Sequence, residues 1–221
     1  MSKLSIAFLL VFISGLIAAF AIGSVWSFYV YEFVYFMNPG RRWWSSDIPS
    51  LGYSFIVVIV MMTSYFMQKK EGPIPKLKEV PATKWLVALL AVFFLMYIFA
   101  VDPFVHKIET INFIKLMIVM GFAFKMIDSP KKLDYAIWVY LAGCAYIGIE
   151  ADNMGRNSDG RVEGIGTVDA PDSNLISATI APAIPFLLYF FWKETWVYKL
   201  LSVVLGALIL NGLVLINSRG A

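Results

Sequence analysis

The chain has 221 residues, of which 60% are hydrophobic and 15% charged, and its formal net charge is +3. A typical soluble domain is about 45–50% apolar and about 25% charged, so this composition excludes an ordinary soluble domain. The small, scattered positive charge gives no support for nucleic-acid binding, and a single histidine excludes a metal site built from several histidines. Repeated apolar runs near the roughly 20 residues that cross a bilayer predict an all-α, polytopic transmembrane helical bundle that forms one integral membrane domain.

The N-terminal region is expected to hold two apolar segments followed by a polar turn. Leu4–Ile22 predicts a retained membrane helix rather than a cleaved signal peptide, because further apolar segments follow it. Val25–Met37 is shorter, and the sequence leaves open whether it crosses the membrane or lies at its surface. After the turn signal at Asn38–Gly40, the residues Arg41–Trp44 predict an interfacial anchor, with indoles at headgroup depth and guanidiniums facing phosphates.

Six clearer membrane spans are expected in the rest of the chain. They are Leu51–Met67, Trp85–Val101, Ile111–Ile127, Tyr135–Ile149, Leu175–Trp192 and Leu200–Ile216. A polar loop, Glu150–Asn174, separates the first four spans from the last two. Pro182 and Pro185 are expected to kink the fifth span, because each proline removes a helical hydrogen bond.

The distribution of lysine and arginine predicts which loops face the cytoplasm. Gln68–Lys84 contains five lysines and three prolines and is expected to be cytoplasmic under the positive-inside rule. Alternation then places Glu150–Asn174 outside. It also places outside all five arginines, which are Arg41, Arg42, Arg156, Arg161 and Arg219. Arginine suits bidentate phosphate binding, so this segregation favours an outer phosphate site; the alternative is chance combined with ordinary headgroup anchoring.

The orientation of the N-terminus stays open between two arrangements. In one, the first two apolar segments form a hairpin and the N-terminus lies outside. In the other, Val25–Met37 is interfacial and Lys3 lies inside. Both arrangements place Asn38–Ser50 on the outer side.

The strongest candidate site lies in the polar loop and at the C-terminus. Arg161 is set among glycines, including Gly164, which permit tight turns and a close approach of the backbone to a ligand. Asp172–Asn174 signals a helix start, whose N–H groups and positive dipole end could attract an anion. Arg219 follows the last apolar span and is flanked by small residues, including Ser218. The plainer alternative is a solvated loop, a capped helix and an arginine that snorkels to the interface.

Four residues elsewhere carry weaker expectations. Lys115 lies about one turn inside its span, where it either snorkels or faces a polar cavity and adds positive charge for a phosphate. Asn211 is expected to form an interhelical hydrogen bond. His106 is of the residue type that most often serves as a general base, but no neighbour in sequence supports that role. Cys144 is expected to be a small packing residue.

Several of these motifs together resemble a known family. Arg161–Gly164, Asp172–Asn174, a following span that contains Pro185, and the terminal Ser218–Ala221 resemble the O-antigen ligase and polymerase superfamily. The N-terminal run Tyr35–Trp43 resembles the subgroup of O-glycosylation ligases associated with exosortase systems, and Lys115 is similar to a lysine of that family.

The resemblance implies a multi-pass enzyme of the bacterial inner membrane with Glu150–Asn174 on the periplasmic face. Such an enzyme transfers a glycan from a polyprenyl-diphosphate carrier to a glycan or protein acceptor, without a metal or another cofactor. In the family, a histidine in a later, large periplasmic loop is proposed to activate the acceptor hydroxyl. This chain ends at Ala221 without that loop, so we expect an N-terminal fragment that lacks its catalytic part and is inactive alone.

The resemblance also implies which residues hold the carrier. Arg161 and Arg219 match the two arginines that are thought to bind the diphosphate, and arginines can stabilise the charge that develops on such a leaving group. The full set of residues expected to bind substrate is Arg161, Arg219, Lys115, Gly164, Asn174 and Ser218.

Three other functions stay open on the sequence alone. One is a polysaccharide polymerase of the same superfamily, and another is a transporter or flippase of lipid-linked sugars. Transporters are often built from repeats with paired broken helices, and no internal repeat is evident here. The third is a non-catalytic membrane scaffold, for which substitution of Arg161 or Arg219 would affect folding alone.

Overall fold

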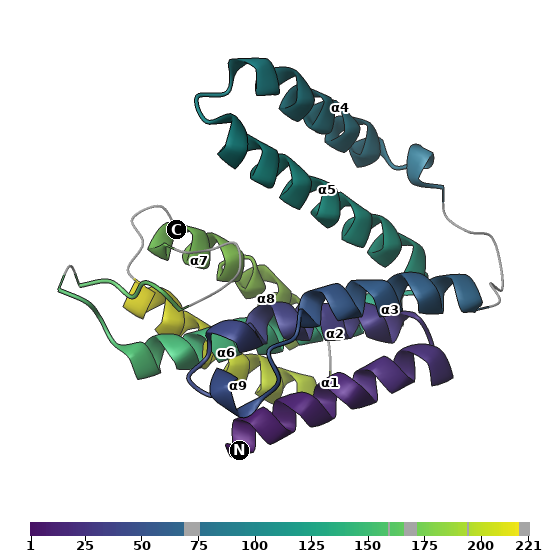
Figure 1. Cartoon of the computed structure of the whole chain (residues 1–221). Helices are drawn as coiled ribbons and strands as arrows, with labels where there is room; N and C mark the ends of the chain where they lie inside the picture. Colours follow the sequence, from purple (N-terminus) through teal and green to yellow (C-terminus); the bar gives the residue numbers. More distant parts are fainter. Residues whose placement is uncertain (69–75, 159, 166–171, 194, 217–221) are drawn as a thin grey trace.

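The computed structural model describes residues 1–68, 76–158, 160–165, 172–193 and 195–216. Within these ranges the chain is all-helical, as the composition predicts, and has no strand. The α-helices are α1 (Lys3–Ala21), α2 (Val25–Met37), α3 (Tyr53–Met67), α4 (Pro81–Met96), α5 (Pro103–Met126), α6 (Pro130–Met154), α7 (Ser173–Ile180), α8 (Ala183–Lys193) and α9 (Trp196–Ile216) (Figure 1). Short 3-10 turns, η1 (Pro39–Arg41), η2 (Ser45–Asp47), η3 (Leu77–Glu79) and η4 (Tyr97–Phe99), lie in the connections.

Several helix boundaries follow local sequence signals. Helices α4, α5 and α6 each begin with a proline at the first helical position, where the missing N–H costs nothing. Helix α2 ends at Met37, and its C-cap Asn38 has a left-handed φ of 39°. The expected kink at Pro182 is confirmed, because α7 ends at Ile180 and α8 begins at Ala183. Pro185 lies in the first turn of α8, a position that tolerates proline.

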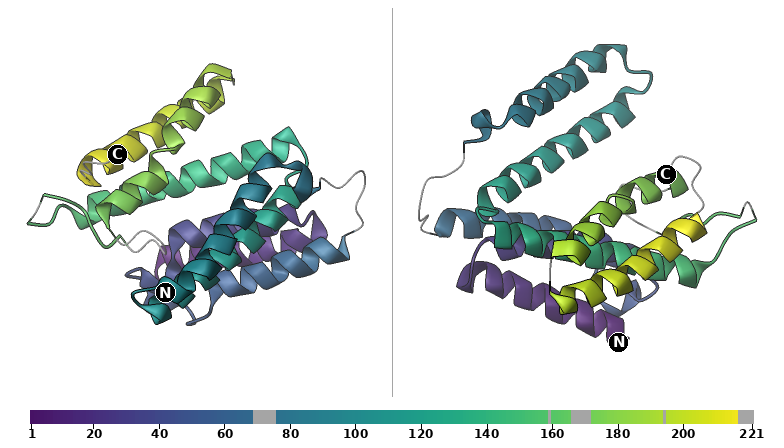
Figure 2. Two further views of the ribbon diagram at one scale, coloured as in Figure 1. Left: turned by 90° about the horizontal axis from the view of Figure 1, so that it is seen from above. Right: turned by 180° about the vertical axis from the view of Figure 1, so that it is seen from behind.

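Helix α2 is the centre of the bundle. It packs against α1, α3 and α6, and α6 in turn packs against α9 (Figures 1 and 2). Its side chains take part in three separate clusters of buried apolar residues: Tyr29 in one, Val34 in the second and Phe36 in the third. Helices α4 and α5 form a hairpin that leans away from this bundle, and α4 has no buried residue among those described (Figure 1).

Hydrogen bonds show which helix ends lie together at one end of the bundle. The backbone N–H of Ser2 donates to Asp47, so the start of α1 lies beside the turn that follows α2. Arg42 in that turn pairs with Glu150 near the end of α6. We call this region the arginine end; it comprises residues 1–2, 38–48, 150–158 and 160–165 and the C-terminal turn of α9.

The opposite end is defined by a second set of contacts. The side chain of Gln68, after α3, accepts from the N–H of Ser24 in the α1–α2 turn and donates to the carbonyl of Ala19 in the last turn of α1. The hydroxyl of Tyr29 donates to the carbonyl of Lys132 at the start of α6. The first two helices therefore form a hairpin whose N-terminus shares the arginine end, as the first of the two expected arrangements requires; the placement of the N-terminus outside stays a prediction.

The protein is a helical membrane protein, but the expectation of six clear spans is wrong. Among the described residues, four helices are long and apolar enough to cross a membrane: α1, Pro81–Phe99, Ser173–Lys193 and α9. Helix α3 is apolar but has 15 residues. In α6, the apolar stretch 135–149 lies between Asp134 and Glu150 and rises only about 22 Å, short of the roughly 30 Å of a hydrocarbon core. In α5, Lys115 and Lys125 interrupt the segment 111–127.

Candidate functional site

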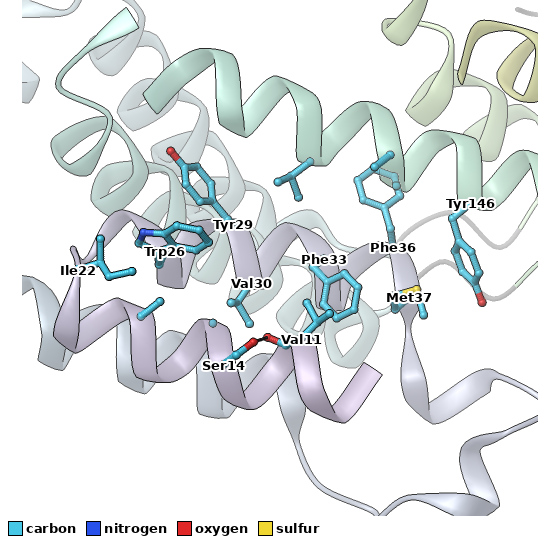
Figure 3. A pocket seen from close by; sticks show the side chains of 15 residues that line it. Val11, Ser14, Ile22, Trp26, Tyr29, Val30, Phe33, Phe36, Met37 and Tyr146 are labelled. Atoms are coloured by element: carbon cyan, nitrogen blue, oxygen red, sulfur yellow. Dashed lines mark hydrogen bonds between the residues drawn. The ribbon is translucent and has the colours of Figure 1, made fainter. Parts of the chain in front are cut away.

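An apolar groove of about 590 Å³ runs along α1, α2 and α6 (Figure 3). It extends from Ile22 and Trp26, near the opposite end of the bundle, to Met37 and Tyr146 at the arginine end. Its lining is almost wholly hydrocarbon and aromatic, so it suits an alkyl or isoprenoid chain and offers little to a polar molecule. One end of the groove lies against a buried arginine, because Cζ of Arg42 is 5.0 Å from the centre of the Tyr146 ring.

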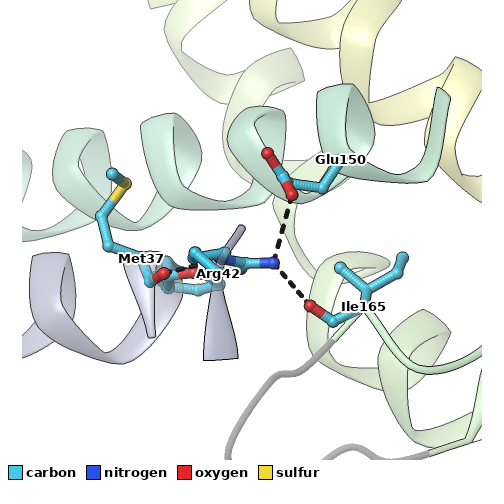
Figure 4. A network of polar contacts seen from close by, with 5 residues as sticks. Met37, Arg42, Glu150 and Ile165 are labelled. Carbon is cyan, nitrogen blue, oxygen red and sulfur yellow. Dashed lines mark hydrogen bonds and ion pairs between the residues drawn. The ribbon is translucent and has the colours of Figure 1, made fainter. Parts of the chain in front are cut away.

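Arg42 is buried and joins three parts of the chain (Figure 4). Its Nε donates to the carbonyl of Met37 at 2.7 Å, and one terminal nitrogen donates to the carbonyl of Phe36 at 2.9 Å. The other terminal nitrogen donates to the carbonyl of Ile165 at 2.5 Å and pairs with Glu150 at 3.4 Å. The side chains of Arg42 and Glu150 are 2% and 11% exposed, so this ion pair is desolvated rather than solvated. We call this group of contacts the Arg42 clasp.

The clasp overturns part of the expected interfacial anchor. Arg41 and Trp43 are exposed, as an anchor requires, but Arg42 and Trp44 are buried. The Trp44 ring packs 5.3 Å from the ring of Phe8 in α1. The prediction that both guanidiniums and both indoles face the headgroups is therefore wrong for Arg42 and Trp44. Successive side chains of this segment alternate between the bundle interior and its surface.

The loop that carries Arg161 is attached to the bundle by its own side chains as well. Val162 and Ile165 are each 1% exposed and join the cluster that contains Phe36 and Ile216. Full burial of two such side chains contributes about 1.5–3 kcal/mol each. Arg161, beside Val162, is partly exposed, whereas Glu163 and Gly164 are exposed. The loop is thus attached to the bundle by the buried side chains of Val162 and Ile165, while Glu163 between them faces outward.

Glycines shape the loop as the sequence predicts. Gly160 and Gly164 have φ values of 71° and 72°, in the left-handed region that glycine adopts without strain. Between them, the N–H of Arg161 donates to the side-chain oxygen of Asn157, and the Arg161 carbonyl accepts from the Asn157 N–H at 2.8 Å. These contacts join Asn157 directly to Arg161.

The end of α9 lies beside this loop. Arg156 donates to the carbonyl of Val214 at 2.9 Å, near the C-terminus of α9, where a positive side chain suits the helix dipole. The expected interhelical hydrogen bond of Asn211 is confirmed, because it donates to Asp152 of α6 at 3.4 Å. Arg219 and Ser218 lie outside the described residues, three and two positions after Ile216, the last residue of α9.

Helix α7 starts where the sequence predicts, with Asp172 as its N-cap. The Asp172 carboxylate accepts from the N–H groups of Asn174 and Leu175 at 2.8 and 2.9 Å. The expectation of free N–H groups for an anion at this helix start is therefore wrong for these two residues. The side chain of Asn174 is exposed in the first turn of α7.

Lys115 and His106 lie on α5, in the hairpin that leans away from the bundle (Figure 1). Lys115 is exposed, and α5 packs against α4, α3 and α2, so none of these contacts brings Lys115 to the Arg161 loop. Nε2 of His106 lies 2.8 Å from the carbonyl of Phe93, which joins α5 to α4. His106 therefore connects the two helices of the α4–α5 hairpin. Cys144 is buried in the cluster around α6, in line with its expected packing role.

No protein-family model, curated protein or solved structure matches this chain. Its function is therefore inferred from the geometry of the arginine end. Of the residues expected to bind substrate, that end includes Arg161 and Gly164. It also includes a buried pair, Arg42 and Glu150, that sequence reasoning missed. Within the described parts of the chain, no three His, Cys, Asp or Glu side chains gather as a metal site would require.

Proposed function

We propose that this chain binds the lipid-linked glycan carrier used by a membrane glycan ligase. Such an enzyme transfers a glycan from a polyprenyl diphosphate to a glycan or protein acceptor at the outer face of the bacterial inner membrane. The observation that supports this proposal is the attachment of the Arg161 loop beside the end of α9. Arg219 follows that end by three residues, which extend at most about 10 Å. In this proposal, Arg161 and Arg219 bind one diphosphate group together.

The chemistry of a lipid-linked diphosphate suits this end of the bundle. Arginine presents a fixed fork of donors that can bind phosphate oxygens in pairs, and such charge-assisted bonds are strong near a low-dielectric medium. The apolar groove between α1, α2 and α6 ends at the same place and offers hydrocarbon surface to an isoprenoid chain. A molecule with a long apolar tail and a doubly charged head is complementary to both features.

The charge distribution supports a periplasmic position for the arginine end. Lys131 and Lys132 at the start of α6, Lys193 at the end of α8 and Lys199 at the start of α9 lie toward the opposite end, whereas Lys3 lies toward the arginine end. Under the positive-inside rule this opposite end faces the cytoplasm, and the loop 150–174 faces the periplasm. The shorter or more polar helices α2, α3, α5 and α6 then complete the multi-pass bundle beside the four long apolar helices.

The proposal is tested by carrier binding to the purified full chain in lipid nanodiscs. Undecaprenyl diphosphate is the probe, and its occupancy is measured by native mass spectrometry at several concentrations. We expect Arg161→Ala and Arg219→Ala each to weaken binding at least tenfold, because each removes charge-assisted hydrogen bonds worth about 1.5–3 kcal/mol. Arg41→Ala is the matched control, since Arg41 is an exposed arginine at the same end but outside the loop.

Two outcomes would contradict the proposal. One is equal affinity of wild type and Arg161→Ala for undecaprenyl diphosphate. The other is an equal loss in all three variants, which would indicate a general effect of surface charge. A weaker affinity for undecaprenyl monophosphate than for the diphosphate would support recognition of the second phosphate.

A further inference from the structure

The position of the Arg161 loop depends on a side chain from a distant part of the sequence. Arg42 uses four of its five N–H groups on protein acceptors, and the carbonyl of Ile165 is one of them. Ile165 follows Arg161 by four residues, so this bond fixes one boundary of the loop to the end of α2. The contact spans 123 positions of sequence and adds a polar link between residues 36–42 and the loop to the apolar packing of Phe36, Val162 and Ile165 in one cluster.

The surroundings of Arg42 explain why a charged group is stable there. Two of its acceptors, the carbonyls of Phe36 and Met37, belong to the last turn of α2, where the helix dipole favours a cation. Asn38 ends α2 in a left-handed conformation, and the chain returns so that Arg42 reaches these carbonyls. The carboxylate of Glu150 supplies the compensating charge, and the Tyr146 ring covers the guanidinium.

The same surroundings exclude Arg42 as a direct phosphate ligand in this conformation. Its side chain is 2% exposed, and its donors are already engaged. Its neighbour Arg41 is exposed and takes part in none of the hydrogen bonds of the Arg42 clasp. Arg42 therefore acts on the arginine end through the groups that it holds.

We infer that Arg42 and Glu150 are positioning residues that set the placement of the loop 160–165 and, through it, of Arg161. The effect on carrier binding rests on the proposed function, whereas the effect on the loop does not. Arginine is required at this position because its planar fork reaches the α2 carbonyls, Glu150 and Ile165 at once. Lysine, a single point of charge, cannot hold all three.

The first test measures the loop directly. A nitroxide spin label is attached to Glu163→Cys, which is exposed, in a chain whose native Cys144 is replaced by alanine. We expect the spectrum of the label to show faster motion in Arg42→Lys and Glu150→Gln, and no change in Arg41→Lys. An unchanged spectrum in folded Arg42→Lys would overturn the inference.

A second variant keeps this test interpretable if a single substitution prevents folding. Replacing both members of a buried ion pair by apolar residues of similar volume is often neutral for stability, because no buried charge is left uncompensated. The double variant Arg42→Met with Glu150→Met removes the hydrogen bond to the carbonyl of Ile165 and replaces both side chains by apolar ones of similar volume. We expect it to fold and to show the mobile label; a folded double variant with the wild-type spectrum would contradict the clasp.

The third measurement is a double-mutant cycle on undecaprenyl diphosphate binding in nanodiscs. We expect Arg42→Lys to weaken binding about tenfold when Arg161 is present and to have no further effect in Arg161→Ala, because Arg42 acts through that residue. Equal losses in both backgrounds would mean that Arg42 contacts the carrier itself, and no loss in either would also overturn the positioning role. If Arg161→Ala alone binds normally, the proposed function fails, while the spectra at position 163 still decide the inference.

Discussion

The carboxylate of Asp47, in the turn after α2, binds the start of α1. It accepts a 2.6 Å hydrogen bond from the backbone N–H of Ser2 and a 3.3 Å bond from the hydroxyl of Ser5. These bonds, the backbone bond of Ser2 above all, hold the pKa of Asp47 below its usual range. A carboxyl whose pKa is lowered by folding stabilises the folded state above its unfolded pKa of about 3.9, and loses that contribution as pH falls through the folded value.

We therefore expect Asp47→Asn to remove a pH-dependent part of the stability. Thermal unfolding of the detergent-solubilised protein is measured for wild type and Asp47→Asn between about pH 3 and pH 7. The wild type should be the more stable of the two at pH 6, and the difference should shrink toward pH 3. A difference that stays constant with pH would show that the Asp47 carboxylate is not the group that responds.

Single residues also show what could be predicted from the sequence and why. The tight turns at the glycines, a helix start at residues 172–174 and the hydrogen-bonding role of Asn211 follow from local chemistry and were predicted; the structure identifies Asp172 as the cap. The burial of Arg42 was not, because Arg41 and Arg42 have the same chemistry and adjacent positions. What separates them is Glu150, 108 positions away, which only the tertiary fold brings into contact.

At the scale of helices, the contact between α6 and α9 depends on two glycines. A Cβ atom on Gly148 would lie 2.2 Å from the carbonyl oxygen of Leu208, and one on Gly212 would lie 2.7 Å from Cα of Gly148. Both neighbours are backbone atoms, which cannot move aside without separating the helices. Small residues permit such close approach in membrane bundles, where packing replaces the hydrophobic effect between helices.

We expect Gly148→Ala to lower the unfolding temperature, although alanine is the better helix former by about 1 kcal/mol. Gly206→Ala is the matched control in α9, because its Cβ would lie 3.6 Å from Leu187, an ordinary contact distance. That variant should be as stable as the wild type or more so. Equal stability of the two variants would show that the α6–α9 backbones are not in close contact.

Helix lengths show a second limit of sequence reasoning at this scale. The break at Pro182 was predicted, because proline acts on its own backbone. The segments 51–67, 111–127 and 135–149 were predicted as clear spans, and their helices do not meet the length and hydropathy of a span. Their polar residues, such as Lys115 and Glu150, lie inside or at the edge of helices that extend past the apolar runs. Hydropathy marked where these helices are, but their boundaries are set by capping and packing.

Across the whole molecule, the arginine end gathers residues from the start, middle and end of the chain. The N-terminus, the turn after α2, the loop after α6 and the end of α9 meet there. The sequence predicted that the arginines share one side, because alternation of the spans places them together. It left open whether α1 and α2 form a hairpin, and the contacts of Asp47 and Gln68 show that they do. The side of the membrane on which the N-terminus lies stays a prediction.

This arrangement predicts which residues are accessible from each side of the membrane. Three single-cysteine variants are made in the Cys144→Ala chain: Trp43→Cys and Glu163→Cys at the arginine end, and Thr195→Cys between α8 and α9. All three native residues are exposed. Spheroplasts are treated with a membrane-impermeant maleimide. We expect positions 43 and 163 to be labelled in intact spheroplasts. Position 195 should be labelled only after permeabilisation, because α8 and α9 meet at the opposite end of the bundle, which the proposed function places in the cytoplasm.

The outcomes separate the fold from its orientation in the membrane. If positions 43 and 163 are labelled from different sides, they do not share one end of the bundle. The contacts of Arg42 with Glu150 and Ile165 would then be contradicted as well. If both are protected while position 195 is labelled in intact spheroplasts, the helix arrangement stands. In that case the opposite end of the bundle faces outward, and a periplasmic diphosphate site is contradicted. Label at all three positions from outside would mean that α8 and α9 do not carry the chain across the bilayer.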